Sequence, residues 1–177
     1  MNQSSAAATT EPPATVRFVT LGVYGFREHD FFAALLRAGV DTFCDIRYRR
    51  GVRGSDYAFV NRARLQKRLA ELGIRYVHLR ELAPSPALRR DQAAADEAAG
   101  TAKRQRATLS ERFVAGYQAQ CLAAFDSRGF VARLGPAGRI VALFCVERQP
   151  AACHRSLLAE RLHTDLGAEI VHLLPVG

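Results

Sequence analysis

The sequence predicts a single α/β domain of three layers, in which a mainly parallel sheet of about five strands carries helices on both faces. Two observations predict this class. Short β-rich runs alternate with amphipathic helical stretches along the chain, a pattern typical of parallel sheets. The run from Ile140 to Cys145 is apolar throughout, as is usual for a strand covered on both faces. A length of 177 residues suits one domain of about 150 residues and a tail.

In the N-terminal half, the expected strands and helices alternate. They are a strand over 16–22, a helix over 29–37, a strand over 40–46, a basic loop over 47–56, a helix over 61–72 and a strand over 74–79. Gly39 and Gly73 follow the two helices, and glycine commonly ends a helix. Asn61 precedes the second helix and is a favoured N-cap residue. These residues mark the expected helix ends.

The C-terminal half continues the alternation after an excursion over 84–106, which we expect to be partly helical and mobile. The elements that follow are a helix over 109–125, a loop over 129–138, a strand over 140–145, a helix over 156–166 and a strand over 169–174. Residues 1–15 are small, polar and proline-containing, which predicts a disordered leader. The domain is therefore expected to span 16–177.

Composition favours a cytoplasmic protein with free thiols. No apolar run approaches the roughly 20 residues that a membrane-spanning helix needs, and no signal peptide is recognisable at the start. The four cysteines are sparse, and a chain of this size needs no disulfides for stability. Cys121 lies in an apolar helical stretch and is expected to be a small core residue. Membrane partners are not expected.

The chain is strongly basic, with a formal net charge of +8. Such a balance favours acidic partners, namely phosphates, nucleotides or nucleic acid. All but two of the 25 basic residues are arginine, the better planar partner for phosphate and carboxylate. An arginine-rich genomic composition would give the same balance, so charge alone does not decide between the two explanations.

Several reactive side chains gather between the strand that ends at Cys145 and the helix expected from Ser156. Cys153, His154 and Arg155 fall at the cap and first turn of that helix, where the helix dipole favours an anion and lowers the pKa of a cysteine. Cys153 could then act as a thiolate nucleophile, with Arg155 as an anion clamp. The alternative is a structural cap, with Arg155 paired to Glu147.

Glu147 lies two residues after Cys145, so both side chains point to the same side of an extended segment. A buried carboxylate there could be a general acid or base, or could fix Arg155 or Arg47 by an ion pair. A metal site is a third interpretation, since Cys145, Glu147, Cys153 and His154 all carry ligand atoms. Their spacing is not that of zinc ribbons or fingers.

A second constellation follows the strand over 40–46. Asp45 and Arg47 alternate with Ile46 and share one face of the strand end. Arginines, tyrosines and glycines follow, and such residues can hold phosphate or stack on bases; they include Tyr48, Arg49, Arg50, Gly51, Arg53, Gly54 and Tyr57. A solvated basic loop is the alternative.

Tyr24 follows the first strand and would reach the same sheet edge, because sites in parallel sheets lie at the carboxyl ends of the strands. The surrounding Thr20–Gly25 segment is not a dinucleotide-binding fingerprint. The histidines at 29, 78, 163 and 172 are expected to be packing or helix-start residues.

These motifs resemble the bacterial family called domain of unknown function 488. The matching pieces are Thr20-Leu-Gly22, Asp45-Ile-Arg47, Leu65–Gly73 with Ile74-Arg-Tyr76, His78-Leu-Arg-Glu81-Leu82, and Leu143-Phe-Cys145-Val-Glu147 with Cys153-His154-Arg155-Ser156. The resemblance covers about residues 16–174 and implies a compact α/β domain without supplying a chemistry. Relatives usually carry Thr-Ile-Gly-His-Ser where this chain has Thr20-Leu-Gly-Val-Tyr24. After the Asp-x-Arg element they commonly carry a Pro and a Ser where this chain has Tyr48-Arg-Arg-Gly51.

The sequence thus predicts an enzyme acting on a phosphate-bearing substrate, a nucleotide or nucleic acid, at the carboxyl edge of the sheet. The expected catalytic residues are Cys153, Glu147 and His154, and the expected anion-binding residues are Asp45, Arg47, Arg49, Arg50, Arg155 and Tyr24. A non-catalytic module that binds nucleic acid or an anion, and a metal-binding protein, are the alternatives. No cofactor or oligomeric state follows from the sequence.

Overall fold

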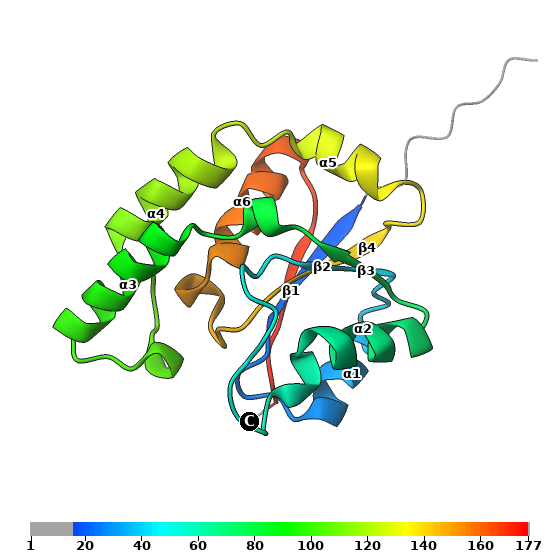
Figure 1. The fold of residues 1–177 in the computed structure, drawn as a ribbon. Helices are drawn as coiled ribbons and strands as arrows, with labels where there is room; N and C mark the ends of the chain where they lie inside the picture. The colour runs from blue at the N-terminus through cyan, green and yellow to red at the C-terminus, as the bar shows by residue number, and fades with distance from the viewer. Residues whose placement is uncertain (1–15, 177) are drawn as a thin grey trace, which may run out of the picture.

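The computed structural model describes residues 16–176, so the expected leader lies outside the described residues. Five strands form one sheet in the order β3-β2-β4-β1-β5, and every neighbouring pair is parallel (Figure 1). The strands are β1 (Arg17–Gly22), β2 (Thr42–Asp45), β3 (Arg75–His78), β4 (Ile140–Cys145) and β5 (Ile170–Leu173). The predicted parallel sheet is therefore confirmed, with all five strands close to their expected places.

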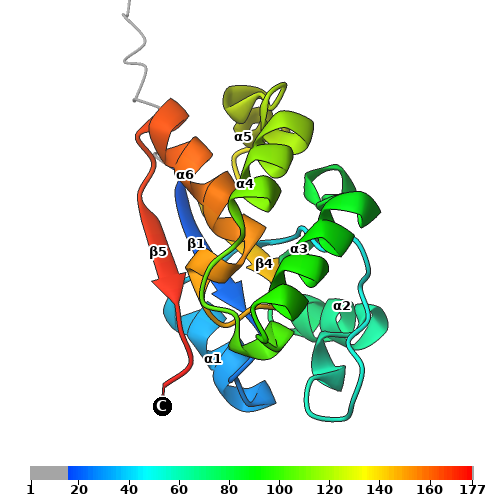
Figure 2. The same cartoon turned by 90° about the vertical axis from the view of Figure 1, so that its left-hand side faces the viewer.

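Helices cover both faces of the sheet, as Figures 1 and 2 show. They are α1 (Glu28–Arg37), α2 (Arg62–Glu71), α3 (Pro86–Ala98), α4 (Glu111–Tyr117), α5 (Ser127–Leu134) and α6 (His154–Leu166). One core packs α1 and α2 against side chains such as Leu21 and Phe144. The other packs α4, α5 and α6 against side chains such as Phe18 and Leu143. Successive residues of a strand thus alternate between the cores, as the pleat requires.

Strand β4 lies at the centre, between β1 and β2, and its neighbours end level with it. Gly22 of β1 is in register with Cys145, and Asp45 of β2 with Phe144. The segments that leave these three strands therefore emerge side by side at one edge of the sheet. This topology brings the two constellations predicted from the sequence together.

The prediction of a loop over 129–138 is wrong, because α5 occupies most of that range. Asp126 caps this helix by accepting a hydrogen bond at Oδ1 from the Gly129 backbone N–H at 2.9 Å. Phe130 and Leu134, four residues apart, are buried on one face, and Gly135 ends the helix with φ of 69°. The glycines at 129 and 138 favoured the prediction of a loop, although Phe130 and Leu134 give this segment one apolar face.

Asn61 precedes α2 as predicted, but its side chain does not cap the helix. Its Oδ1 instead accepts from the backbone N–H of Val52 at 2.6 Å, which ties the basic loop to the start of α2. The helix expected over 109–125 is also modified. After Tyr117, α4 passes into a π-helical turn over Gln118–Leu122.

The excursion over 84–106 is partly helical, as predicted, and consists of α3 followed by a 3₁₀ turn over Lys103–Gln105. Leu88 of α3 is buried against α4 beside Gly116, where an added Cβ would collide with it. Gln92 is buried and accepts from the backbone N–H of Ser110. The expected mobility of this segment stays a prediction. None of the helices within 16–176 combines the length and apolarity needed to cross a bilayer.

Candidate active site

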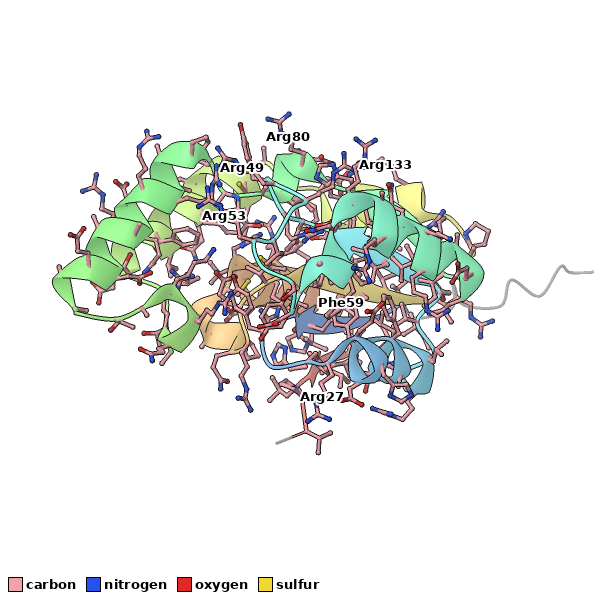
Figure 3. The ribbon with its side chains drawn as sticks, turned by 60° about the horizontal axis from the view of Figure 1, so that its bottom comes forward. Arg27, Arg49, Arg53, Phe59, Arg80 and Arg133 are labelled. Carbon is pink, nitrogen blue, oxygen red and sulfur yellow. The ribbon has the colours of Figure 1, made fainter. Side chains whose placement is uncertain are left out.

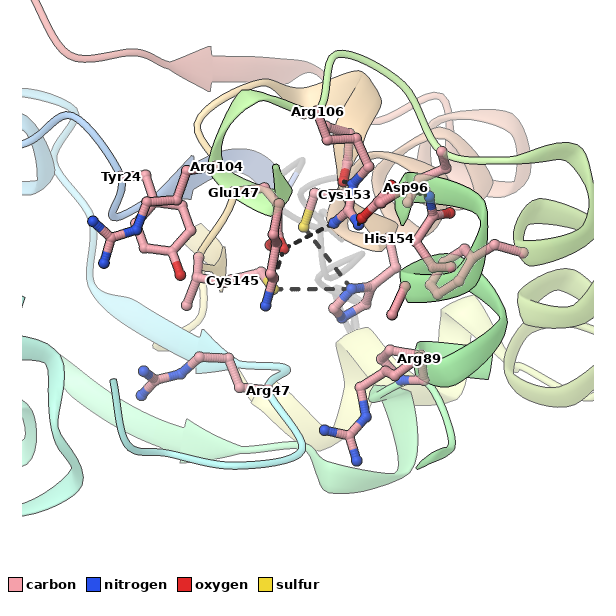
Figure 4. A pocket seen from close by; sticks show the side chains of 18 of the residues that line it. Tyr24, Arg47, Arg89, Asp96, Arg104, Arg106, Cys145, Glu147, Cys153 and His154 are labelled. Carbon is pink, nitrogen blue, oxygen red and sulfur yellow. Dashed lines mark hydrogen bonds and ion pairs between the residues drawn. The ribbon is translucent and has the colours of Figure 1, made fainter. Parts of the chain in front are cut away.

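A cavity of about 740 Å³ opens at the carboxyl edge of the sheet. Its walls are the basic loop after β2, helix α3 with the 3₁₀ turn that follows, and the turn between β4 and α6. Cys145, Glu147, Cys153 and His154 all line it, as do Arg47 and Tyr24 from the neighbouring strand ends. Residues from both predicted constellations therefore meet in one cavity (Figure 4).

Two thiols and an imidazole form a compact buried cluster in this cavity. Cys145 is the last residue of β4, Cys153 is the N-cap residue of α6, and His154 is its first residue. His154 Nδ1 lies 3.9 Å from the Sγ atom of each cysteine. The three donor atoms lie within 4.8 Å of one another. The thiol–imidazole cluster, as we call these three residues, is held by the central strand and by a helix start.

The hydrogen bond on the far side of the His154 ring fixes its orientation. Nε2 lies 3.1 Å from the backbone oxygen of Ile46. A carbonyl oxygen can only accept, so Nε2 carries the proton and donates it. In the neutral ring, Nδ1 therefore presents its lone pair to the two sulfur atoms. Tyr117 packs beside the ring with centroids 5.2 Å apart.

The pKa values of the two thiols are shifted in opposite directions. Burial raises the pKa of Cys153, but the hydrogen bond from Cys145 and the charges of Arg155 and His154 outweigh burial and hold that pKa well below its ordinary value. The hydrogen bond to Cys153 and burial raise the pKa of Cys145 well above its ordinary value. Cys153 thus ionises first, at the N-terminus of α6, where the helix dipole has the same effect.

Glu147 is 6% exposed and lies beside the cluster. Its Oε1 accepts from Arg106 Nη2 at 2.9 Å and lies 3.5 Å from Lys103 Nζ. Its Oε2 lies 3.6 Å from Cys145 Sγ. Burial, followed by the charge of Cys153, raises the pKa of Glu147 against the lowering effect of the two cations. The partners predicted for Glu147, Arg155 and Arg47, are therefore replaced by Lys103 and Arg106.

Arg106 joins α3 to the β4–α6 turn, a role that no sequence motif predicts. It donates to Asp96 Oδ2 at 2.7 Å, to Glu147 Oε1, and from Nε to the backbone oxygen of Ala152 at 3.3 Å. Asp96 in turn accepts from Gln92 Nε2. Arg106 and Glu147 are 41 residues apart, so no local spacing pairs them. The only available signal was the basic run in the excursion.

Arg155 is fully buried and lies outside the residues that line the cavity. Its Nη1 donates to the backbone oxygen of Glu147 at 2.6 Å and its Nη2 to that of Arg148 at 3.0 Å. Its Nε lies 3.4 Å from Thr20 Oγ1. The prediction that Arg155 binds an anion does not fit this geometry, because its guanidinium is already hydrogen-bonded to backbone carbonyls of the turn. Arg155 shapes the β4–α6 turn instead.

Asp45 and Arg47 share one face of the strand end, as predicted, and form a buried two-pronged ion pair. Arg47 Nε donates to Asp45 Oδ1 at 2.8 Å and Nη2 to Oδ2 at 2.7 Å. Tyr76 donates to the same Oδ2 at 2.8 Å. The Arg47 guanidinium also lies 4.6 Å from the centre of the Phe144 ring. Only Arg47 of the pair reaches the cavity lining.

The arginines of the basic loop divide into two groups. Arg49 and Arg53 are exposed and line the cavity, and Figure 3 shows them together beside α3, far from Arg27. Arg50 lies outside the cavity lining, and its guanidinium lies near the Tyr76 hydroxyl. The expected anion contact of Arg50 therefore does not fit the cavity.

Further arginines at the cavity lie over aromatic rings. Tyr24 packs edge-on against Tyr57 with centroids 5.2 Å apart, and the Arg104 guanidinium lies 5.1 Å from the centre of the Tyr24 ring. Arg89 lies 4.4 Å from the centre of the Tyr48 ring. Arg89 and Arg104 come from the excursion, where no local motif marks them as part of a site.

The family model described as "Domain of unknown function DUF488" matches residues 28–162. The chain belongs to this family. The match confirms the resemblance carried by the motifs, and it includes Asp45, Arg47 and the whole segment from Cys145 to Arg155. No curated protein and no solved structure matches the chain. The chemistry of this DUF488 protein must therefore be argued from its own cavity.

We predict that Asp45→Asn lowers the free energy of unfolding by about 3 kcal/mol, because it leaves the Arg47 charge, 4% exposed, without its carboxylate. Urea unfolding followed by circular dichroism measures this loss. The matched control is Glu28→Gln, which removes an exposed ion pair with Arg64 at 3.5 Å and should cost below about 1 kcal/mol. Equal losses in the two variants would contradict the prediction.

We also predict that Gly22→Ala destabilises the protein by about 1–3 kcal/mol. A Cβ at Gly22 would collide with the backbone carbonyl of Glu147, the group that Arg155 holds. Thermal unfolding measures the change. Gly51→Ala is the control, since the nearest atom to its added Cβ is Asn61 Oδ1 at 3.9 Å. A Gly22→Ala protein as stable as Gly51→Ala would mean that the turn moves aside freely.

Proposed function

We propose that this DUF488 protein is an enzyme that acts on a small phosphate-bearing substrate of nucleotide size. One observation carries the proposal: a single cavity joins a buried cluster of thiols, imidazole and carboxylate to rim arginines that have no acidic partner among residues 16–176. The arginines would hold the phosphate, and the thiol–imidazole cluster with Glu147 would be the reacting centre. Cavities of this volume commonly enclose small ligands.

The charge of the cavity lining supports an anionic substrate. Seven arginine or lysine residues line the cavity against three carboxylates. Arg47, Lys103 and Arg106 are paired with carboxylates, whereas the other four cations form no ion pair within the described part of the chain. Those four are Arg49, Arg53, Arg89 and Arg104. Guanidinium groups suit phosphate because they can donate two parallel hydrogen bonds.

Two of the lining arginines also have nitrogen donors that form no hydrogen bond within the described residues. Arg47 Nη1 and Arg89 Nε are buried and have no hydrogen-bond partner among residues 16–176. Burial, followed by the charge of Arg49, lowers the pKa of Arg89. The rim therefore concentrates positive charge that a bound phosphate would offset.

Aromatic side chains on the rim favour a nucleotide among phosphate-bearing molecules. Tyr24 and Tyr48 both line the cavity, and tyrosine rings stack readily on nucleobases. A cavity with walls on several sides also suits a small molecule better than a long strand. Binding that requires an oligonucleotide would favour the nucleic-acid alternative.

At the reacting centre, Glu147 is suited to carry a proton, because one of its oxygens is held by cations and the other faces the cluster. The sulfur atoms and His154 Nδ1 are electron-rich and face the same cavity. Reaction and anchoring thus fall on different residues, which allows them to be tested separately.

We predict that Arg49→Ala and Arg53→Ala each weaken binding of a nucleoside phosphate by about tenfold, since each removes a charge-assisted contact. Calorimetry at low salt with nucleoside mono-, di- and triphosphates and inorganic phosphate measures this. Arg133→Ala is the matched control, because Arg133 is exposed on α5 and lies outside the cavity lining. Unchanged binding in the rim variants would reject the anchoring role.

We predict that Cys153→Ser and Glu147→Gln keep this binding and lose at least about 100-fold in turnover. Mass spectrometry of the same panel of phosphates, incubated with each protein, detects the converted compound. Cys121→Ser is the control, since the Cys121 thiol lies away from the cavity and contacts the backbone oxygen of Ala83. A fully active Cys153→Ser protein would contradict the catalytic role, and binding without turnover in the unaltered protein would favour the non-catalytic alternative.

A further inference from the structure

We infer that Cys145, Cys153 and His154 bind a zinc ion through their two Sγ atoms and Nδ1, with the fourth coordination position open to the cavity beside Glu147. This inference deepens the proposed function, on which it relies only for the substrate class. It replaces direct attack by a cysteine with chemistry at a metal. It stands on donor geometry, ring orientation, burial and charge.

The separations between the donor atoms are close to those of a tetrahedral site. With typical zinc–sulfur and zinc–nitrogen bonds, sulfur and nitrogen ligands lie ~3.6 Å apart and two sulfur ligands ~3.8 Å apart. Here Nδ1 lies 3.9 Å from each sulfur atom, and all three donors lie within 4.8 Å of one another. Nδ1 would have to move by a few tenths of an ångström, and the two sulfur atoms by up to about 1 Å toward each other, for all three to reach bonding distance of one ion.

His154 already has the orientation of a metal ligand. Its Nε2 donates to the Ile46 carbonyl, so the lone pair of Nδ1 faces the sulfur atoms. Ligating histidines almost always donate their second nitrogen in this way, which fixes the tautomer and makes the ligand nitrogen more basic. Tyr117, packed beside the ring and hydrogen-bonded to the Leu82 carbonyl, limits its rotation.

The chemistry of the donor set selects a soft ion. Two thiolates and one imidazole suit zinc, whereas magnesium and calcium prefer oxygen ligands. On binding, each cysteine of the pair that is still protonated would release its proton to solvent, and the two thiolates would neutralise the charge of Zn²⁺. The ion would therefore enter a buried site without leaving an excess charge there.

Glu147 completes the arrangement without joining it as a fourth ligand. Its Oε2 lies 3.6 Å from Cys145 Sγ, but the group of donors within 4.8 Å of one another comprises only the three residues of the cluster. Three protein ligands with one open position is the pattern of catalytic zinc, whereas structural zinc is closed by four. The charge of Glu147 is offset by Arg106 and Lys103.

The open position suggests hydrolysis of the phosphate-bearing substrate. A water molecule bound there would lose one proton to Glu147, and its oxygen would form a bond to the electrophilic atom of the substrate. The bond to the leaving group would break, and Glu147 would return the proton to that group. Water is the only co-reactant, and no electron is gained or lost.

The first experiment measures metal in the full chain, purified without a histidine tag and without chelator. We expect about one zinc ion per chain, and a thiolate-to-cobalt charge-transfer absorption when Co²⁺ replaces zinc. Cys145→Ser, Cys153→Ser and His154→Gln should each bind zinc at least about 100-fold more weakly, whereas Cys121→Ser should bind it like the unaltered protein. Zinc uptake unchanged in the three ligand variants would overturn the inference.

A second measurement needs no variant to fold. Iodoacetamide labelling of Cys145 and Cys153 in the unaltered protein is followed by peptide mass spectrometry, with and without a zinc chelator. We expect zinc to protect both, and Cys153, the more acidic thiol, to be labelled faster than Cys145 after zinc removal, with Cys121 labelled equally in either state. A protein that takes up neither zinc nor Co²⁺, or whose two cysteines label alike in both conditions, overturns the inference.

The two proposals can fail independently. Nucleoside-phosphate binding is measured on the zinc-loaded and the zinc-free protein alongside metal content. Binding that persists in a protein unable to take up metal rejects the zinc site and leaves the arginine rim. A loaded zinc site in a protein that binds no phosphate-bearing compound supports the metal and rejects the substrate class.

Discussion

The candidate site depends on the burial of one guanidinium. Arg155 is fully buried and donates hydrogen bonds to two backbone carbonyls and a threonine hydroxyl. The dipoles of these groups stabilise its charge in place of a carboxylate. A buried charge without such partners costs several kcal/mol, so the β4–α6 turn is held in the one shape that supplies them. That shape presents Glu147, Cys153 and His154 to the cavity. The same charge favours an anionic Cys153, so a structural residue also sets the electrostatics of the site.

Arg106 is a second cation on which the site depends. Arg106 contacts carboxylates from α3 and from the β4–α6 turn, so the excursion between β3 and α4 becomes a wall of the cavity. The two carboxylates repel each other unless a cation lies between them, and therefore Arg106, Asp96 and Glu147 are mutually dependent. This network explains why the excursion contributes to the site although its own apolar face is small.

The parts of this structure that follow from local pattern could be predicted from the sequence. The continuous apolar strand ending at Cys145 and the alternation of strands with helices predicted the parallel sheet, and its topology brought Arg47 to the same edge as Cys153. What failed depends on packing between distant segments. Asn61 has a nearer backbone partner than the helix N-terminus, and Arg155 finds carbonyls where a carboxylate was expected. The partnership of Arg106 with Glu147 has no local signature.

The distribution of charge within the cavity also separates structural cations from those available to a ligand. Glu147 already has Arg106 and Lys103 for partners, and Arg47 already has Asp45. The remaining rim arginines form no ion pair among residues 16–176, and burial together with the charge of Arg49 lowers the pKa of Arg89. Like charges held together on a cavity wall destabilise the folded chain unless an anion joins them. An anionic ligand bound at this rim would relieve that repulsion, and it would lie in the same cavity as the thiol–imidazole cluster.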